Sequence, residues 1–198
     1  MATQKVEKRP QRSWALLFVR NALLWVLPVA GVWMVAAPVY NRFLLVSAEN
    51  LVRLTESPNA TNLLRKDAHF AYIQRRDLPP AKSLVHSFRV TDVHFHLVML
   101  GILFLAVPRV PVRQRLENLG WAVLITIFFD IFLIFLYVKF TYATQLGAWS
   151  VAHYGAFARN FWGLGKHLFD LPFKLALPLL LWAGFYIKEL MNELRPRE

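Results

Sequence analysis

The chain has 198 residues, of which 57% are hydrophobic, 15% aromatic and 18% charged, and its formal net charge is +11. Soluble domains are usually about one quarter charged, so this composition is typical of a protein that lies in a lipid bilayer. Because the chain contains no cysteine, disulfides, thiolate metal sites and a cysteine nucleophile are excluded.

Basic residues flank the apolar stretches of the chain. They form three groups: Lys5, Lys8, Arg9 and Arg12 before the first apolar stretch, Arg109, Arg113 and Arg115 between two later ones, and Lys188, Arg195 and Arg197 near the C-terminus. This pattern predicts a multi-pass membrane protein with both termini cytoplasmic. The outer loop is also basic, which leaves the inverted topology open. No zinc-finger, RNA-binding or helix-turn-helix signature is present, so we expect no nucleic-acid partner.

The first half of the chain predicts one membrane span followed by a long loop. The first apolar stretch carries no charge for 21 residues, long enough to cross a hydrocarbon core roughly 30 Å thick. We predict a transmembrane helix over residues 18–41, after a basic cytoplasmic tail at residues 1–17. An amphipathic extension and an outer, periplasmic loop follow over residues 42–92. Two short runs in this loop, 69–74 and 83–90, suit a small β-hairpin.

The second half predicts three further spans. Its segments are a transmembrane helix at 93–108, a cytoplasmic loop at 109–118, a third transmembrane helix at 119–140, an aromatic interfacial segment at 141–170, a fourth transmembrane helix at 171–188 and a cytoplasmic tail at 189–198. The fold class expected from the sequence is an all-α integral membrane protein with four transmembrane helices, an interfacial helix and a small outer-loop hairpin.

Asp130 lies inside the third predicted span, where a carboxyl is costly unless it faces the bundle interior or water. Its candidate hydrogen-bond partners are Thr126, which precedes it by one helical turn, or a neighbouring helix. No basic residue is expected at the same depth on another span, since Lys139 and Lys174 lie towards the outer end, and this favours contact with a partner chain. We expect a structural or assembly role for Asp130, with proton or ion handling as the alternative.

Asp92, His94 and His96 stand where the outer loop enters the membrane, in the sequence TDVHFHLV. On a strand all three would share a face, whereas on a helix only Asp92 and His96 would align. They could contribute metal ligands together with His153 or His167, but a His-x-His pair alone is not diagnostic of a metal site. We therefore expect an interfacial pair that bonds to headgroups or to the hairpin, and neither a metal nor another cofactor.

A further polar cluster lies on the aromatic segment and comprises His153, Arg159, Asn160, Lys166, His167 and Asp170. Basic groups beside Trp and Tyr suit either an anionic lipid headgroup or ordinary interfacial anchoring, and we favour anchoring. A haem held between His96 and His153 would require the aromatic segment to dip into the bundle.

One stretch carries a family resemblance. Residues 93–115 (VHFHLVMLGILFLAVPRVPVRQR) open with His-Phe-His-Leu-Val and end a short span in Pro-Arg, after a basic tail, one span and a loop of about 50 residues. This arrangement resembles the small membrane proteins encoded beside bacterial exosortases, the enzymes that sort exported proteins. The resemblance implies an accessory protein. Exosortase itself is similar to a cysteine transpeptidase, and this chain has no cysteine, so no family active site transfers to it.

Two functions follow as expectations. The first is a non-enzymatic accessory or structural subunit of the inner membrane that contacts membrane lipids and a membrane-protein partner. The alternative is a carrier or enzyme that handles a lipid or metabolite through outer-surface residues, namely Asp92, His94, His96, His153, Arg159 and His167.

Overall fold

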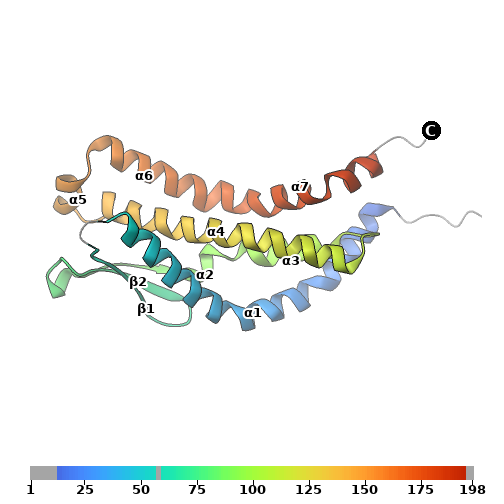
Figure 1. Cartoon of the computed structure of the whole chain (residues 1–198), viewed down its shortest axis with the longest axis horizontal. Coiled ribbons are helices and arrows are strands. Elements are labelled where there is room, and N and C mark those ends of the chain that lie inside the picture. The colour runs from blue at the N-terminus through green and yellow to red at the C-terminus, as the bar shows by residue number, and fades with distance from the viewer. Residues whose placement is uncertain (1–12, 57–58, 195–198) are drawn as a thin grey trace, which may run out of the picture.

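The computed structural model describes residues 13–56 and 59–194. It shows an elongated helical molecule with a small β-sheet towards one end (Figure 1). The helices that run along its length are α1, Trp14–Leu54, α3, His96–Ala106, α4, Val112–Thr144, α6, Ala156–Leu168, and α7, Lys174–Leu194. The predicted tails at residues 1–17 and 189–198 lie partly outside the described residues.

Within the described residues, three helical stretches are long and apolar enough to cross a membrane: Trp14–Leu54, Val112–Thr144 and Ala156–Met191. The prediction of a mainly helical chain with membrane-spanning helices is confirmed to this extent. The predicted second span falls on Val90–Ala106, which is apolar but shorter. Its main helix, α3, has 11 residues and extends only about 16 Å at 1.5 Å per residue, roughly half of a hydrocarbon core.

The helix α1 contains 41 residues and continues well past the predicted span. The Ser13 hydroxyl caps its start by accepting the Leu16 N–H at 3.4 Å. Pro28 and Pro38 lie inside the helix, which helices in apolar surroundings tolerate. The first half mostly exposes apolar side chains, whereas from Asn41 onwards one face is buried. The predicted amphipathic extension is therefore the second half of the same helix.

The loop after α1 folds into a three-stranded antiparallel sheet, in which the predicted hairpin is present as the pair β2–β3 and β1 is an additional strand. Its strands are β1, Thr61–Arg65, β2, Phe70–Arg75, and β3, Leu84–Arg89, in the order β1-β2-β3, with a 3-10 turn, Pro80–Lys82, before β3. The sequence did not indicate β1 because its two apolar residues, Leu63 and Leu64, are adjacent and lack the alternation of a half-buried strand.

The larger hydrophobic core lies between α1, the sheet and α4. α1 contributes Leu44, Leu45, Ala48 and Val52, the sheet contributes Leu63, Ala71, Ile73 and Phe88, and α4 contributes Leu133, Ile134, Leu136, Val138 and Tyr142. A sheet of this size cannot build a core alone. It shares one with the helices, and this fixes its position on α1 and α4.

Two short helices and one irregular turn complete the chain. α2, Val90–Val93, follows β3 directly, and α5, Ala148–His153, follows α4 after Gly147, whose φ is +58°. α6 packs along α4 and passes through a π turn, Phe169–Phe173, into α7. This turn contains Pro172, which has no N–H for the regular helical ladder. The part of the predicted interfacial segment from Ala156 onwards thus joins the fourth span in one helical stretch, and its first part is divided between the end of α4 and α5.

The helices α1 and α3 approach closely at Gly101. A Cβ atom added there would lie 3.0 Å from Cγ1 of Val29. Gly101→Leu is therefore expected to push the two helices apart and to lower the free energy of unfolding by about 1–3 kcal/mol. Gly120→Leu is the control, because nothing lies within 4 Å of a Cβ added at that position. Thermal unfolding in detergent checks this, and an equal Tm for the two variants would contradict it.

Candidate functional site

A buried polar cluster forms where α1, α3 and α4 meet. Asp130 on α4 is 0% exposed, and the hydroxyl of Tyr40 on α1 donates to its Oδ2 at 2.8 Å. Nε2 of His96, the first residue of α3, lies 3.5 Å from the other carboxyl oxygen, Oδ1. Because each residue comes from a different helix, the cluster links three helices through residues that are distant in sequence.

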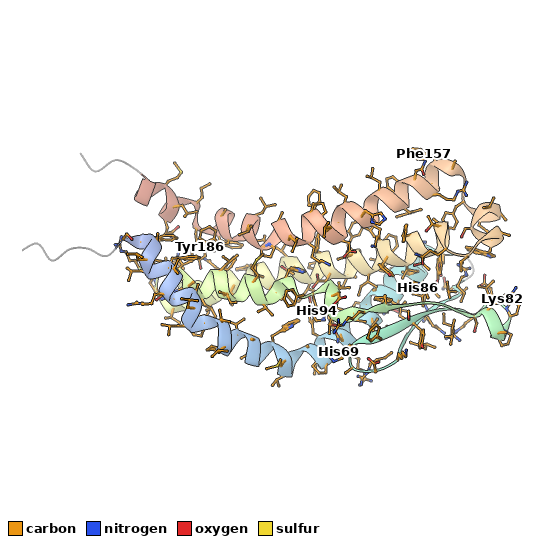
Figure 2. The ribbon with its side chains drawn as sticks, turned by 180° about the vertical axis from the view of Figure 1, so that it is seen from behind. His69, Lys82, His86, His94, Phe157 and Tyr186 are labelled. Atoms are coloured by element: carbon orange, nitrogen blue, oxygen red, sulfur yellow. The ribbon has the colours of Figure 1, made fainter. Side chains whose placement is uncertain are left out.

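A break between α2 and α3 places His96 in this cluster. His94 follows α2 with φ −112° and ψ 12°, outside α-helical geometry, and α3 starts two residues later. His94 consequently faces α1, as Figure 2 shows. Its Nε2 hydrogen-bonds with Oδ1 of Asn41, and its ring centroid lies 4.7 Å from that of Trp33.

The predicted group of Asp92, His94 and His96 does not form a single site. The Asp92 side chain is 66% exposed and pairs with Arg89 at 3.7 Å, while the two histidines are buried against different helices. Neither a continuous strand nor a continuous helix describes this stretch, and for that reason neither of the predicted alignments occurs.

Several polar atoms of the cluster have no partner. Among the described residues, Oδ1 of Asp130, both ring nitrogens of His96 and Nδ1 of His94 are buried without a hydrogen bond. The 3.5 Å between His96 and Asp130 permits an electrostatic contact but is long for a hydrogen bond. A lone buried charge is costly, so the carboxyl and the imidazole are either both neutral or both ionised.

Asp130 bonds to a neighbouring helix through Tyr40, which is one of the two expected alternatives, and not to Thr126. The Thr126 hydroxyl donates to the carbonyl oxygen of Ala122 at 2.8 Å, one turn earlier in α4, a common arrangement for a threonine inside a helix. Asp130 does not face a partner chain either, because its side chain is enclosed within this chain. Its neighbours come from other helices and could not be read from spacing along α4.

The predicted outer cluster is divided among separate contacts. His153 on α5 is exposed and stacks on Trp149 at 4.1 Å, and its Nδ1 lies 2.8 Å from the Trp149 carbonyl oxygen. His167 packs against a phenylalanine of α4, and Arg159 lies half-buried on α6. His96 is buried elsewhere, so the histidines do not face one another as a haem pair. Over the described part of the chain, no three His, Asp or Glu side chains gather in a way that could hold a metal ion.

Asp170 forms a row of ion pairs with two lysines on the same helical stretch. Nζ of Lys166 lies 3.0 Å from its Oδ2, and Nζ of Lys174 lies 2.7 Å from its Oδ1. Lys174 also donates to the backbone carbonyl of Asp92 at 3.2 Å. These contacts fasten the start of α7 to α2 and leave Asp170 fully paired.

A second polar site, which the sequence analysis did not indicate, surrounds Arg75 on β2. The guanidinium donates to both carboxylate oxygens of Asp77, at 2.9 and 2.6 Å, and lies 3.6 Å from Glu56. The rings of Tyr142 and Trp149 cover it, with centroids 4.6 and 4.3 Å away. The sheet, the end of α1, α4 and α5 are therefore joined through one side chain.

The alternation of β2 explains why Arg75 is buried. Ala71, Ile73 and Arg75 occupy every second position of the strand and share its buried face, and this pattern could have revealed the site. The hydrogen bond from Arg75 lowers the pKa of Asp77. Burial opposes the charge on Arg75, but the hydrogen bond and charge of Asp77 outweigh it and raise the pKa of Arg75.

Comparison with known proteins gave no match to a family model, to a curated protein or to a solved structure. The functional argument therefore rests on the geometry of the chain itself.

Proposed function

We propose that the protein is a non-enzymatic accessory or structural subunit of a bacterial inner-membrane complex. In this proposal α3 makes a fourth, short crossing, both termini are cytoplasmic and the sheet lies on the outer side. The arrangement in Figure 1 supports this, because the start of α1 and the end of α7 lie at the same end of the molecule, away from the sheet. An even number of crossings returns a chain to its starting side, and the exposed apolar side chains of α1 suit contact with membrane lipid.

The observation that carries the proposal is the way in which the helices hold the sheet. Glu49 of α1 accepts a backbone N–H of β1 at 2.6 Å, and Asn41 donates to a carbonyl between β1 and β2 at 2.9 Å. The hydroxyls of Thr61 on β1 and Tyr142 on α4 lie 2.8 Å apart. Polar side chains of the helices are thus used for attachment, and the attached sheet offers a partner a surface in a fixed position.

The family resemblance described above suggests the partner. We propose an exosortase-type protein-sorting enzyme in the same membrane. An accessory role fits a chain that contains no cysteine, since the sorting chemistry would then belong to the partner.

The proposal is tested by loosening the sheet from α1 without opening the apolar core. The full-length tagged protein is purified from its native membrane in mild detergent, and co-purifying proteins are identified by mass spectrometry. We expect an exosortase-type enzyme in stoichiometric amount with the wild type. Glu49→Leu removes a charged acceptor from the sheet and should reduce the recovery of the enzyme about tenfold.

Asn50→Leu is the matched control, because Asn50 is the exposed neighbour of Glu49 on the same helix. It should retain the partner. Hydrogen exchange of β1 shows whether Glu49→Leu has loosened the sheet. The proposal fails if the wild type purifies without a stoichiometric membrane protein, or if a loosened sheet recovers the enzyme as well as the wild type does.

A second candidate function is the handling of a lipid or metabolite by a carrier or enzyme. One observation favours it, an apolar groove of 370 Å³ between α1, α3 and α4 whose wall includes Trp25, Leu97 and Tyr40. An amphiphile with its chain in this groove would bring its polar end near Asp130. Lipid extraction decides the matter: an amphiphile retained by the wild type and lost in His96→Ala supports this function, and none retained excludes it.

A further inference from the structure

A polar hollow opens where the end of α1, β2, α4 and α5 come together. It has a volume of 380 Å³, and its lining includes Glu56, Lys139, Trp149, His153 and Tyr154. The hollow is distinct from the Asp130 cluster and has no part in the attachment to a partner proposed above.

Lys139 is the unusual member of this lining. It is 7% exposed, and among the described residues its ammonium group makes no hydrogen bond or ion pair; its Nζ lies 5.6 Å from the ring centroid of Phe135. Its Nζ is not fully enclosed, so it can reach a ligand in the hollow. Arg75, the neighbouring cation, is already occupied by Asp77 and Glu56. Lys139 is therefore the cation left to bind an anionic group inside the hollow.

The other polar groups indicate what kind of anion fits. Nδ1 of His153 donates to the Trp149 carbonyl oxygen at 2.8 Å, so Nε2 of the neutral ring is an acceptor and suits an N–H group of a ligand, while Lys139 is a donor for its phosphate. The Tyr154 hydroxyl provides a further donor. A phosphate ester presents several acceptor oxygens to such a set of donors. Trp149 and Tyr154 are also the residue types that lie at the level of lipid headgroups.

The charges around the hollow cancel. Arg75 and Lys139 are positive, while Glu56 and Asp77 are negative, so an electrically neutral ligand suits the site better than an anionic one. We propose that the hollow binds a zwitterionic phosphodiester of the phosphoethanolamine type. The phosphate contacts the Lys139 ammonium, and the ammonium group of the ligand donates to Nε2 of His153, with the negative charge of Glu56 on the same side of the hollow. Such a group is found both on membrane lipids and on soluble glycerophosphodiesters.

Native mass spectrometry of the delipidated full-length protein in detergent tests the proposal. Three probes are titrated separately: phosphatidylethanolamine, phosphatidylglycerol and soluble glycerophosphoethanolamine. We expect one tightly bound phosphatidylethanolamine and at least about tenfold weaker binding of phosphatidylglycerol, which corresponds to 1.4 kcal/mol. Equal retention of the soluble diester would identify a soluble source of the same group. Failure of both ethanolamine probes to bind, or equally tight binding of phosphatidylglycerol, would overturn the proposal.

Variants assign the binding to the hollow. Lys139→Met keeps the length of the side chain without its charge and should weaken binding about tenfold. Lys82→Met removes an exposed lysine at the tip of the sheet (Figure 2) and should leave binding unchanged. His153→Ala alters an exposed residue, so the fold is retained, and it should weaken binding about threefold. Unchanged affinity in either Lys139→Met or His153→Ala would refute the site.

Discussion

Replacing Asp130 by leucine is expected to lower the free energy of unfolding by about 1–3 kcal/mol, because the Tyr40 hydroxyl loses its buried acceptor. The carboxyl is fully buried, and Tyr40 donates to it at 2.8 Å. Asp130→Asn should be tolerated, since the amide oxygen accepts the same hydrogen bond and the amide N–H can donate to His96. Thermal unfolding in detergent, followed by tryptophan fluorescence, measures the difference between the two variants.

A double-mutant cycle separates this cause from a general loss of packing. Tyr40→Phe alone should cost about 1 kcal/mol, but it should cost little in the Asp130→Leu background, where the hydroxyl has already lost its acceptor. If Asp130→Leu were as stable as Asp130→Asn, the carboxyl would not link the helices.

Replacing Arg75 by leucine should have the larger effect, about 2–4 kcal/mol. The Arg75 and Glu56 side chains are each 8% exposed, whereas Asp77 is 32% exposed. Removing one partner of a buried ion pair leaves an uncompensated charge, and the exposure of Asp77 moderates the cost. Hydrogen exchange should show the largest increase in β1 and β2. Arg76→Leu is the matched control, because Arg76 is adjacent and exposed, and it should change little.

The same site gives a pH dependence. The pKa of Asp77 is lowered by the hydrogen bond from Arg75, so its contribution to stability is complete above the unfolded value of about 3.9 and is lost as the pH falls through the folded value. Acid unfolding of the sheet should therefore be less pH-dependent in Arg75→Leu than in the wild type. Identical acid profiles would show that the ion pair does not stabilise the sheet.

The sequence predicted what depends on continuous patterns and missed what depends on contacts between them. Uncharged apolar stretches identified the long helices, and the cost of a buried carboxyl identified Asp130 as a residue of interest. The partners of Asp130 were missed because they lie 90 and 34 positions away, at Tyr40 and His96, and helix rotation cannot be read from one sequence. The break after α2 likewise separates His94 from His96, although they are two residues apart.

Arg75 shows a different limit. The first predicted run ended at residue 74, which left Arg75 outside it, yet the strand alternation continues through Arg75. Its charge predicted an exposed side chain, whereas its position in the strand predicted a buried one. Arg75 is buried because aromatic side chains of α4 and α5 cover it. A charged residue at an inward strand position needs a partner of opposite charge. Asp77, two positions after Arg75, was a candidate for that partner.

The length of α1 determines how far along the helix axis the sheet lies and in which direction around that axis it points. Its 41 residues extend about 60 Å, twice the thickness of a hydrocarbon core. From Asn41 onwards, the last turns of α1 pack against the sheet and hold it in place. One residue inserted into the last turns of α1 would move the sheet by about 1.5 Å along the helix axis and rotate it by about 100° around that axis. Insertions or deletions in α1 would therefore be tolerated only when they amount to nearly whole turns of the helix, because only these keep the direction of the sheet around the helix axis.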